Sequence, residues 1–445
     1  MDFMGLLPSF GSFFFTLAAF VVALSIIVAV HEYGHYIIGR WSGIHADVFS
    51  IGFGPVLLKG TDKRGTQWQI AAIPLGGYVK FAGDADAASS GADDAAMAEM
   101  DAKARRRTMH GAPLWARAAT VAAGPVFNFI FAILVFGGYM MVQGVATDDP
   151  VIGEIAPLPT EGIELRPGDR ILAVNGVEAE SLSEFYTAAE ALAPSELVPY
   201  RVLRGGQVIE VAGPYPQPPL VGSVSPQSAA RTAGLRAGDV IISANGERML
   251  AFADLRVATD ASGGEPMQLE VWRDGTVFEV DLAPRSTDLP LPGGGFETRW
   301  LIGLTSGSVF DHATRTPGLL EATAMASAQT WLVIRTSLEG LYYMVTGVIS
   351  TCNIAGPIGI AETSAAMASD GLSDFIWFIA VLSVAVGLLN LFPIPILDGG
   401  HLVFHAWEAV TGKPPSDRAL RILMSIGFAL LITLMVFALT NDLFC

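Results

Sequence analysis

The chain has 445 residues, of which 51 % are hydrophobic and only 16 % are charged. An ordinary soluble protein carries about 25 % charged residues, so this composition indicates a membrane protein. The net charge of −17 argues against nucleic acid as a partner, because binding phosphates requires a basic surface. Two cysteines, Cys352 and Cys445, are too few for a disulfide framework or a thiolate metal cage.

Charged residues are absent from four stretches, each long enough for a helix of about 20 residues to cross the hydrocarbon layer. These stretches predict four transmembrane helices and lie at residues 3–31, 118–147, 375–397 and 422–441. No basic residue precedes the first stretch and no small-residue cleavage site follows it, so we expect a retained span and not a signal peptide. A fifth uncharged stretch, 341–361, contains Gly356 and Pro357, which break a helix, and an interfacial or protein-packed segment is favoured there.

The first span ends in a His-Glu-x-x-His motif formed by His31, Glu32 and His35. Residues four apart share one face of a helix, so both imidazoles can reach one zinc ion. Glu32 is adjacent and can take a proton from a water whose pKa the metal lowers to about 7. The alternative is a capped helix end with surface histidines, which is disfavoured because ionisable residues beside an apolar span are usually functional.

Residues 46–83 follow this motif and contain two apolar, strand-like runs on either side of a Lys63-Arg64-Gly65 turn. We predict a membrane-associated β-element whose exposed edge could pair with an unwound substrate helix. The next segment, 84–112, begins with a stretch rich in alanine, serine and aspartate. It indicates a mobile cytoplasmic loop.

The region after the second span contains a repeat. The run LRPGDRILAVNG at 165–176 recurs as LRAGDVIISANG at 235–246, and each copy precedes a helical patch and a strand–turn–strand pattern. The second copy, which begins at Gly234, resembles the signature of PDZ domains of bacterial proteases; the first copy has Glu164 at the position of that glycine. The resemblance implies two tandem PDZ-like α/β domains that bind peptide tails, with a rigid spacer as the alternative.

The third span runs into a segment that holds Asn390, Pro393, Pro395 and Asp398. Its prolines and glycines unwind the backbone, and Asp398 is a carboxylate at membrane depth. Because the first and third spans are expected to run in the same direction, Asp398 is predicted to meet the two histidines as the third ligand of a catalytic zinc. A rival histidine pair at helical spacing, His401 and His405, has no glutamate between its members.

The placement of basic residues predicts the orientation in the membrane. Arginines crowd the start of the second span at 105–107 and 117, and basic residues crowd the start of the fourth at 413–421, so these edges are expected in the cytoplasm. Segment 144–371 holds 28 acidic and 13 basic residues and is expected to lie outside the cytoplasm, as are both chain ends. The catalytic site then lies towards the cytoplasmic side.

The His-Glu-x-x-His motif, the N-x-x-P-x-P-x-L-D-G motif and the PDZ-like modules between them resemble the site-2 protease family of intramembrane zinc metalloproteases, in its bacterial regulator-of-sigma-E branch. The resemblance covers the chain almost end to end. It implies zinc ligation by His31, His35 and Asp398 and a general base at Glu32. Substrate binding would fall to Asn390, Pro393 and Pro395, although a polar residue such as Asn390 can also simply join helices together.

The family resemblance further implies a multi-pass protein of the bacterial inner membrane that cleaves single-pass membrane proteins, namely an anti-sigma factor and leftover signal peptides. The alternative is a non-enzymatic, membrane-anchored PDZ scaffold with an inert metal site, which is disfavoured because the base and all three ligand types are present. The predicted fold is a multi-span α-helical membrane protein with four transmembrane helices, a membrane-associated β-element and two PDZ-like α/β domains. Its expected divisions are 1–45, 46–83, 84–112, 113–145, 146–213, 214–286, 287–371 (linker and interfacial helical segment), 372–412 and 413–445.

Overall fold

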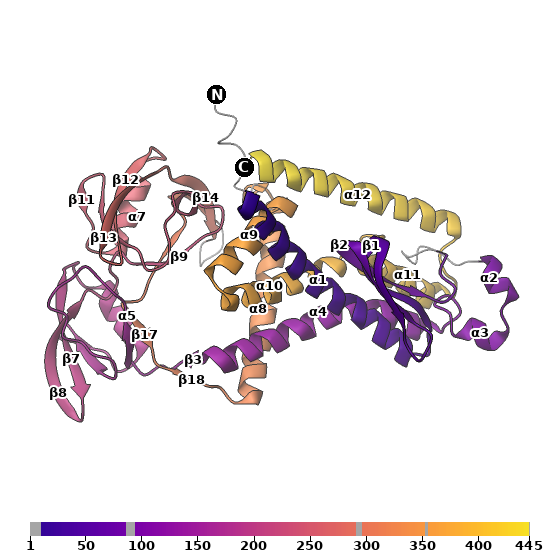
Figure 1. Ribbon diagram of the computed structural model, residues 1–445, viewed down its shortest axis with the longest axis horizontal. Helices are drawn as coiled ribbons and strands as arrows, with labels where there is room; N and C mark the ends of the chain where they lie inside the picture. The colour runs from indigo at the N-terminus through magenta and orange to yellow at the C-terminus, as the bar shows by residue number, and fades with distance from the viewer. Residues whose placement is uncertain (1–9, 86–93, 291–295, 352–354, 445) are drawn as a thin grey trace. The chain divides into compact units, whose positions relative to one another are not determined.

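The computed structural model describes residues 10–85, 94–290, 296–351 and 355–444 (Figure 1). The chain divides into two compact units, which are described separately below. The membrane unit comprises Met1–Tyr139, Gly318–Thr346 and Thr351–Cys445. The insert unit comprises Met140–Pro317 and Gly347–Ser350.

Among the described residues of the membrane unit, four helices are long and apolar enough to cross a membrane, and they coincide with the four spans predicted from the charge gaps. Only 6 % of the most apolar window of the last helix is buried inside the protein, so its apolar surface needs lipid around it. The bounds of these helices are α1 Phe10–Trp41, α4 Leu114–Gln143, α10 Leu372–Asn390 and α12 Asp417–Phe444.

The doubtful fifth stretch is interrupted, as its sequence predicts. Helix α8 (Leu319–Val345) ends within it, and α9 (Pro357–Asp370) begins at its proline, which suits the first turn of a helix. The Asp442 carboxylate of α12 accepts hydrogen bonds from the backbone N–H groups of Gly356, Ile358 and Gly359 at 2.7–3.2 Å. Residues 352–354 lie outside the described residues, and the interfacial or protein-packed placement of segment 341–361 stays a prediction.

The helices of the membrane unit pack through small and apolar side chains. Helix α9 packs against α1, α10 and α12. Ala23 and Ile27 of α1 meet Ile379 of α10 in one cluster, and Phe136 of α4 meets Ala326 of α8 and other small residues in a second. These contacts hold α1 and α4 in place, and both helices carry residues of the site described below.

The expected β-element is present as an antiparallel hairpin, β1 (Ala46–Thr61) and β2 (Gln67–Phe81), which lies against α1 (Figure 1). Phe49 of β1 and Trp68 of β2 are paired across the strands, and their rings pack on Tyr36 of α1. Two short helices follow, α2 (Asp94–Glu99) and α3 (Ala102–Arg106). Of the expected mobile loop, residues 86–93 lie outside the described residues.

The insert unit contains the repeat as two modules with the same strand order. The first sheet is ordered β6-β5-β7-β8 and the second β11-β10-β12-β13. The first module has β5 Arg170–Val174, β6 Val177–Glu178, α5 Leu182–Glu190, β7 Leu197–Arg204 and β8 Gln207–Pro214. The second has β9 Val221–Val224, α6 Ala229–Thr232, β10 Val240–Ala244, β11 Glu247–Arg248, α7 Phe252–Ala261, β12 Met267–Arg273 and β13 Thr276–Leu282.

The two modules also repeat one ion pair. Arg204 binds Asp169 in the first module, and Arg273 binds Asp239 in the second, each through two hydrogen bonds of 2.6–2.7 Å. Both aspartate side chains are 1 % exposed. The agreement of strand order and ion pair confirms the repeat as a structural one, while the assignment as PDZ-like domains stays a prediction.

Three short strands from the expected 287–371 linker return to the modules. β16 (Leu304–Ser306) pairs with β9, β17 (Phe310–His312) with β4 (Ile152–Ile155), and β18 (Thr314–Arg315) with β3 (Val145–Ala146). Before them, β14 (Arg285–Pro290) pairs with β15 (Phe296–Leu301). Phe310 is buried in the core of the first module, so that core is completed by residues that follow the second.

Candidate active site

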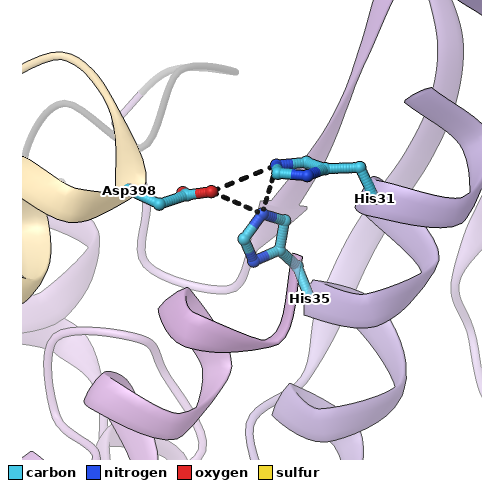
Figure 2. A group of neighbouring side chains, drawn as sticks. All are labelled: His31, His35 and Asp398. Carbon is cyan, nitrogen blue, oxygen red and sulfur yellow. Dashed lines mark hydrogen bonds and ion pairs between the residues drawn. The ribbon is translucent and has the colours of Figure 1, made fainter. Parts of the chain in front are cut away.

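Three side chains from the two ends of the chain converge in the membrane unit (Figure 2). The Nε2 atoms of His31 and His35 lie 3.1 Å apart, and Oδ2 of Asp398 lies 3.1 Å from the first and 3.5 Å from the second. One ligand atom from each residue falls within 4.8 Å of the others. Two nitrogens and one carboxylate oxygen directed at one point are the donor set that a catalytic zinc ion takes, with a fourth position left for water.

The backbone around Asp398 turns sharply before α11 (Asp398–Thr411) begins. A Cβ atom at Gly399 would lie 2.3 Å from the Leu391 carbonyl oxygen, and one at Gly400 would lie 2.3 Å from the Ile394 carbonyl oxygen. Only glycine fits such a close approach of backbone to backbone. The two glycines therefore let the chain fold back after α10 and start a helix at the carboxylate.

Helix α4 forms the wall behind the two histidines. The Thr120 carbonyl oxygen accepts a hydrogen bond from Nδ1 of His35 at 2.8 Å, and the amide of Asn128 contacts Nδ1 of His31 at 3.2 Å. Between them, a Cβ atom at Gly124 would lie 2.3 Å from Nε2 of His35. Partners on Nδ1 orient both rings so that Nε2 is free to face a metal, as in other histidine metal sites.

Sequence reasoning did not identify this wall. The signal that could have found it is the pair Gly124 and Asn128 inside a charge-free span, because a polar amide in a transmembrane helix is rarely without a partner. Asn128 is completely buried. Among the described residues, its amide oxygen and Oδ2 of Asp398 are buried without a hydrogen-bond partner, although Oδ2 is within ion-pair distance of both histidines. A metal ion between Asp398 and the histidines would satisfy Oδ2.

A cavity of about 760 Å³ opens beside the three ligand residues and is lined by Glu32 and Asn390 as well. Gly77, Tyr78 and Val79 of β2 line the same cavity, so the hairpin borders it. Asn390 donates from Nδ2 to the Val386 carbonyl at 3.0 Å. The other two predicted substrate-binding residues, Pro393 and Pro395, are not among the residues that line this cavity.

The rival pair also lines the cavity. His401 and His405 lie on α11, beyond Asp398. Within the part of the chain that the structure describes, however, the group with three mutually close ligand atoms is that of His31, His35 and Asp398. The geometry therefore favours the predicted set over a site centred on the rival pair.

The model of peptidase family M50 matches residues 19–434. The chain belongs to this family. A protein of Agrobacterium fabrum that carries the name of a zinc metalloprotease is 37 % identical over 95 % of this chain and 94 % of its own length. The regulator of sigma-E protease RseP of Escherichia coli (strain K12) is 33 % identical over 97 % of this chain and 99 % of its own length.

Membership of family M50, together with the four apolar helices, identifies the chain as a membrane metalloprotease of the site-2 protease type. The non-enzymatic scaffold considered above therefore gives way to an enzyme. The similarity extends over both ends of the chain, so it includes the His31–His35 motif near one end and Asp398 near the other.

Proposed function

We propose that this M50 protease uses zinc to cleave single-pass membrane proteins within the bacterial inner membrane, as a step of regulated intramembrane proteolysis. The proposal is carried by one observation, namely that His31, His35 and Asp398 converge beside Glu32 in a cavity bordered by a β-hairpin. The three converging residues would hold the ion. When bound, zinc lowers the pKa of a water to about 7 and polarises the substrate carbonyl.

Glu32 is the general base in this scheme. Its carboxylate lies on the cavity wall beside the two histidines and takes the proton of the attacking water. It can then deliver that proton to the departing amide nitrogen, so that the peptide bond breaks without releasing a strong base. Thr120 and Asn128 keep the two imidazoles in place during these steps.

The hairpin provides a way to extend the substrate. A peptide bond inside a transmembrane helix is shielded, and pairing with the edge of a sheet would expose it. Residues 48–51 of β1 are paired on both sides, with residues 77–80 and with residues 67–70 of β2, so they offer no edge. Within the described sheet, residues 77–80 of β2 are paired on one side, and Tyr78 of this segment lines the cavity together with Phe53 of β1. Asn390 would contact the extended substrate backbone from the opposite wall, while a role for Pro393 and Pro395 in substrate binding stays a prediction.

The insert unit would select substrates from the periplasmic side. Its two PDZ-like modules would act as a size filter or as readers of peptide tails, and substrates already trimmed on their outer side would pass. A relative's name, regulator of sigma-E protease, supports an anti-sigma factor as one substrate class, and leftover signal peptides are a second. In the proposed topology, the active site would lie towards the cytoplasmic face.

The deciding experiment compares Glu32→Gln with Asp398→Ala in the full chain, reconstituted in vesicles with a model single-pass substrate. We expect Glu32→Gln to keep one zinc per chain and to lose cleavage, because it removes the base and not a ligand. Asp398→Ala should lose both the zinc and the cleavage activity. Elemental analysis measures the zinc content of each variant. Cleavage at the wild-type rate by Glu32→Gln would overturn the mechanism, and substrates that co-purify with this inactive variant would identify the natural targets.

A further inference from the structure

A second cavity, of about 370 Å³, lies at the end of α1 and is lined by cationic side chains. Three of these are arginines from separate segments: Arg40 from the last turn of α1, Arg64 from the hairpin turn and Arg107 from the segment after α3. His45 lines the same cavity. Neither the catalytic scheme nor the family assignment uses these residues.

The arginines are not neutralised by nearby carboxylates. Across the described residues, none of the three forms an ion pair; Arg40 instead donates to the Tyr36 hydroxyl at 2.9 Å. The closest acid in the hairpin turn is Asp62, whose carboxylate accepts from the backbone N–H groups of Arg64 and Thr66 and from the Tyr36 hydroxyl. These hydrogen bonds, that from the Arg64 backbone first, lower the pKa of Asp62 and hold its carboxylate in the turn.

The walls of the cavity are fixed by hydrogen bonds between its segments. The Thr66 hydroxyl donates to the Ala46 carbonyl at 2.8 Å, and the backbone N–H of His45 donates to the Arg107 carbonyl at 2.8 Å. Tyr36 and Thr66 are buried. Nε2 of His45 lies 3.6 Å from Oδ1 of Asp47.

Several guanidinium groups around a small cavity match an anion that offers several oxygens, and phosphate is such an anion, which arginine binds through paired hydrogen bonds. The position of the cavity indicates where that phosphate comes from. Arg40 is followed by Trp41, which is 72 % exposed at the end of a candidate span. Tryptophan and arginine at such a position mark the level of the lipid headgroups.

We propose that this cavity, which we call the arginine pocket, binds the phosphate group of an anionic phospholipid. The bound phosphate joins the end of α1 to the turn of the hairpin, and both of these elements also border the catalytic cavity. Lipid in the arginine pocket therefore restricts the relative motion of α1, which carries His35, and the β1–β2 hairpin, which carries the proposed substrate-binding edge. Binding itself does not depend on the proteolytic mechanism, so the two proposals can fail separately.

The test measures lipid binding to the full chain, purified in a neutral detergent, by native mass spectrometry with dioleoylphosphatidylglycerol and dioleoylphosphatidylcholine. The pocket variant is Arg64→Gln/Arg107→Gln, which leaves the Arg40–Tyr36 contact intact. The matched control is Lys63→Gln/Arg106→Gln, which removes the same charge from adjacent positions that do not line the pocket. We expect phosphatidylglycerol to bind about tenfold more weakly to the pocket variant and unchanged to the control.

Two further arms identify the source of the phosphate. Inorganic phosphate at millimolar concentration should not displace phosphatidylglycerol, because only the lipid also gains from acyl chains beside the exposed Trp41. Displacement by inorganic phosphate alone would assign the pocket to a soluble phosphate and overturn the lipid proposal. Equal loss of binding in the control would overturn it too, since the attraction would then come from diffuse surface charge.

Discussion

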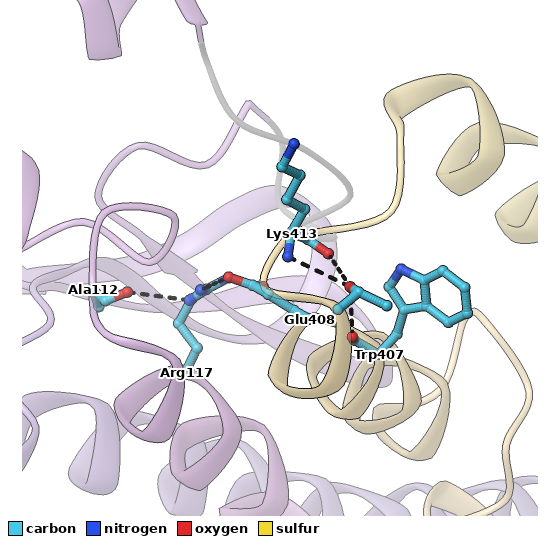
Figure 3. Close-up of polar contacts among 6 residues, drawn as sticks. Ala112, Arg117, Trp407, Glu408 and Lys413 are labelled. Carbon is cyan, nitrogen blue, oxygen red and sulfur yellow. Dashed lines mark hydrogen bonds and ion pairs between the residues drawn. The ribbon is translucent and has the colours of Figure 1, made fainter.

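Arg117 of α4 and Glu408 of α11 form a bidentate ion pair, with Nη2–Oε1 at 2.6 Å and Nη1–Oε2 at 3.0 Å (Figure 3). The Nε atom of the same arginine donates to the Ala112 carbonyl at 3.2 Å. Thr120, one turn further along α4, holds His35, and Asp398 begins the helix that carries Glu408. One turn of α4 therefore positions two of the proposed metal ligands, His35 on α1 through Thr120 and Asp398 on α11 through Arg117.

Reversing one member of this pair should loosen the site. We expect Arg117→Glu to lower metal affinity and cleavage about tenfold or more, because supporting partners of metal ligands commonly contribute that much. Arg117→Glu/Glu408→Arg should regain most of both, since the ion pair is restored with opposite sense. Zinc titration measures the metal affinity, and a cleavage assay measures the activity. A double variant with no more metal affinity or activity than Arg117→Glu would show that the ion pair has no positioning role.

Gly124 should tolerate no side chain. In Gly124→Ala the new Cβ would lie 2.3 Å from Nε2 of His35 and 2.7 Å from Nε2 of His31. We expect loss of zinc and of cleavage, although alanine favours a helix by up to about 1 kcal/mol over glycine. Gly138→Ala is the matched control on α4, because nothing lies within 4 Å of its Cβ position, and it should keep full activity. Zinc content near one per chain in Gly124→Ala would refute this account of the wall.

Asn128 should act through its oxygen. When His31 binds a metal through Nε2, its proton is on Nδ1, so Nδ1 needs a hydrogen-bond acceptor. The Asn128 amide contacts Nδ1, and rotating this amide by half a turn would bring its buried oxygen towards Nδ1. Asn128→Asp keeps an acceptor and should retain activity, whereas Asn128→Leu should lose metal affinity by about 10- to 100-fold. Equal behaviour of the two variants in zinc titrations would exclude this role.

The sequence predicts the spans and the histidine motif because both signals are local: a run without charges, and a four-residue spacing on a helix. Asp398 is also predicted, through the direction of its span. The wall around Gly124 and Asn128 was missed because α4 is apolar on all sides, so no periodicity indicates which face meets α1. Strands β16 and β17 were missed for another reason, since three-residue strands show no alternation and β17 pairs with residues about 155 positions earlier.

The ion pair between Arg204 and Asp169 should stabilise the first module of the insert unit in a pH-dependent way. Burial alone would raise the pKa of Asp169, but hydrogen bonds from Arg204 and from the Arg166 backbone outweigh it, and the pKa lies below its usual range. A carboxyl whose pKa is lower in the folded state adds stability above its unfolded pKa of about 3.9, and that stability disappears as the pH falls through the folded value. The contribution should therefore be equal at pH 7 and pH 5 and decline below about pH 4.

Arg204→Met tests this directly, because it leaves Asp169 buried without its partner. We expect a loss of about 3 kcal/mol in the free energy of local unfolding, read from hydrogen exchange of β5 and β7 in the full chain and corrected for intrinsic rates. Arg170→Met is the matched control: its pair with Asp149 is 45 % and 61 % exposed, so less than about 1 kcal/mol should be lost. The difference in unfolding free energy between the two variants should narrow as the pH falls. The narrowing should begin above about pH 4, because burial without Arg204 raises the pKa of Asp169 and protonation relieves the unpaired carboxylate. A gap that stays constant with pH would mean that Arg204 stabilises the module through packing and not through its charge.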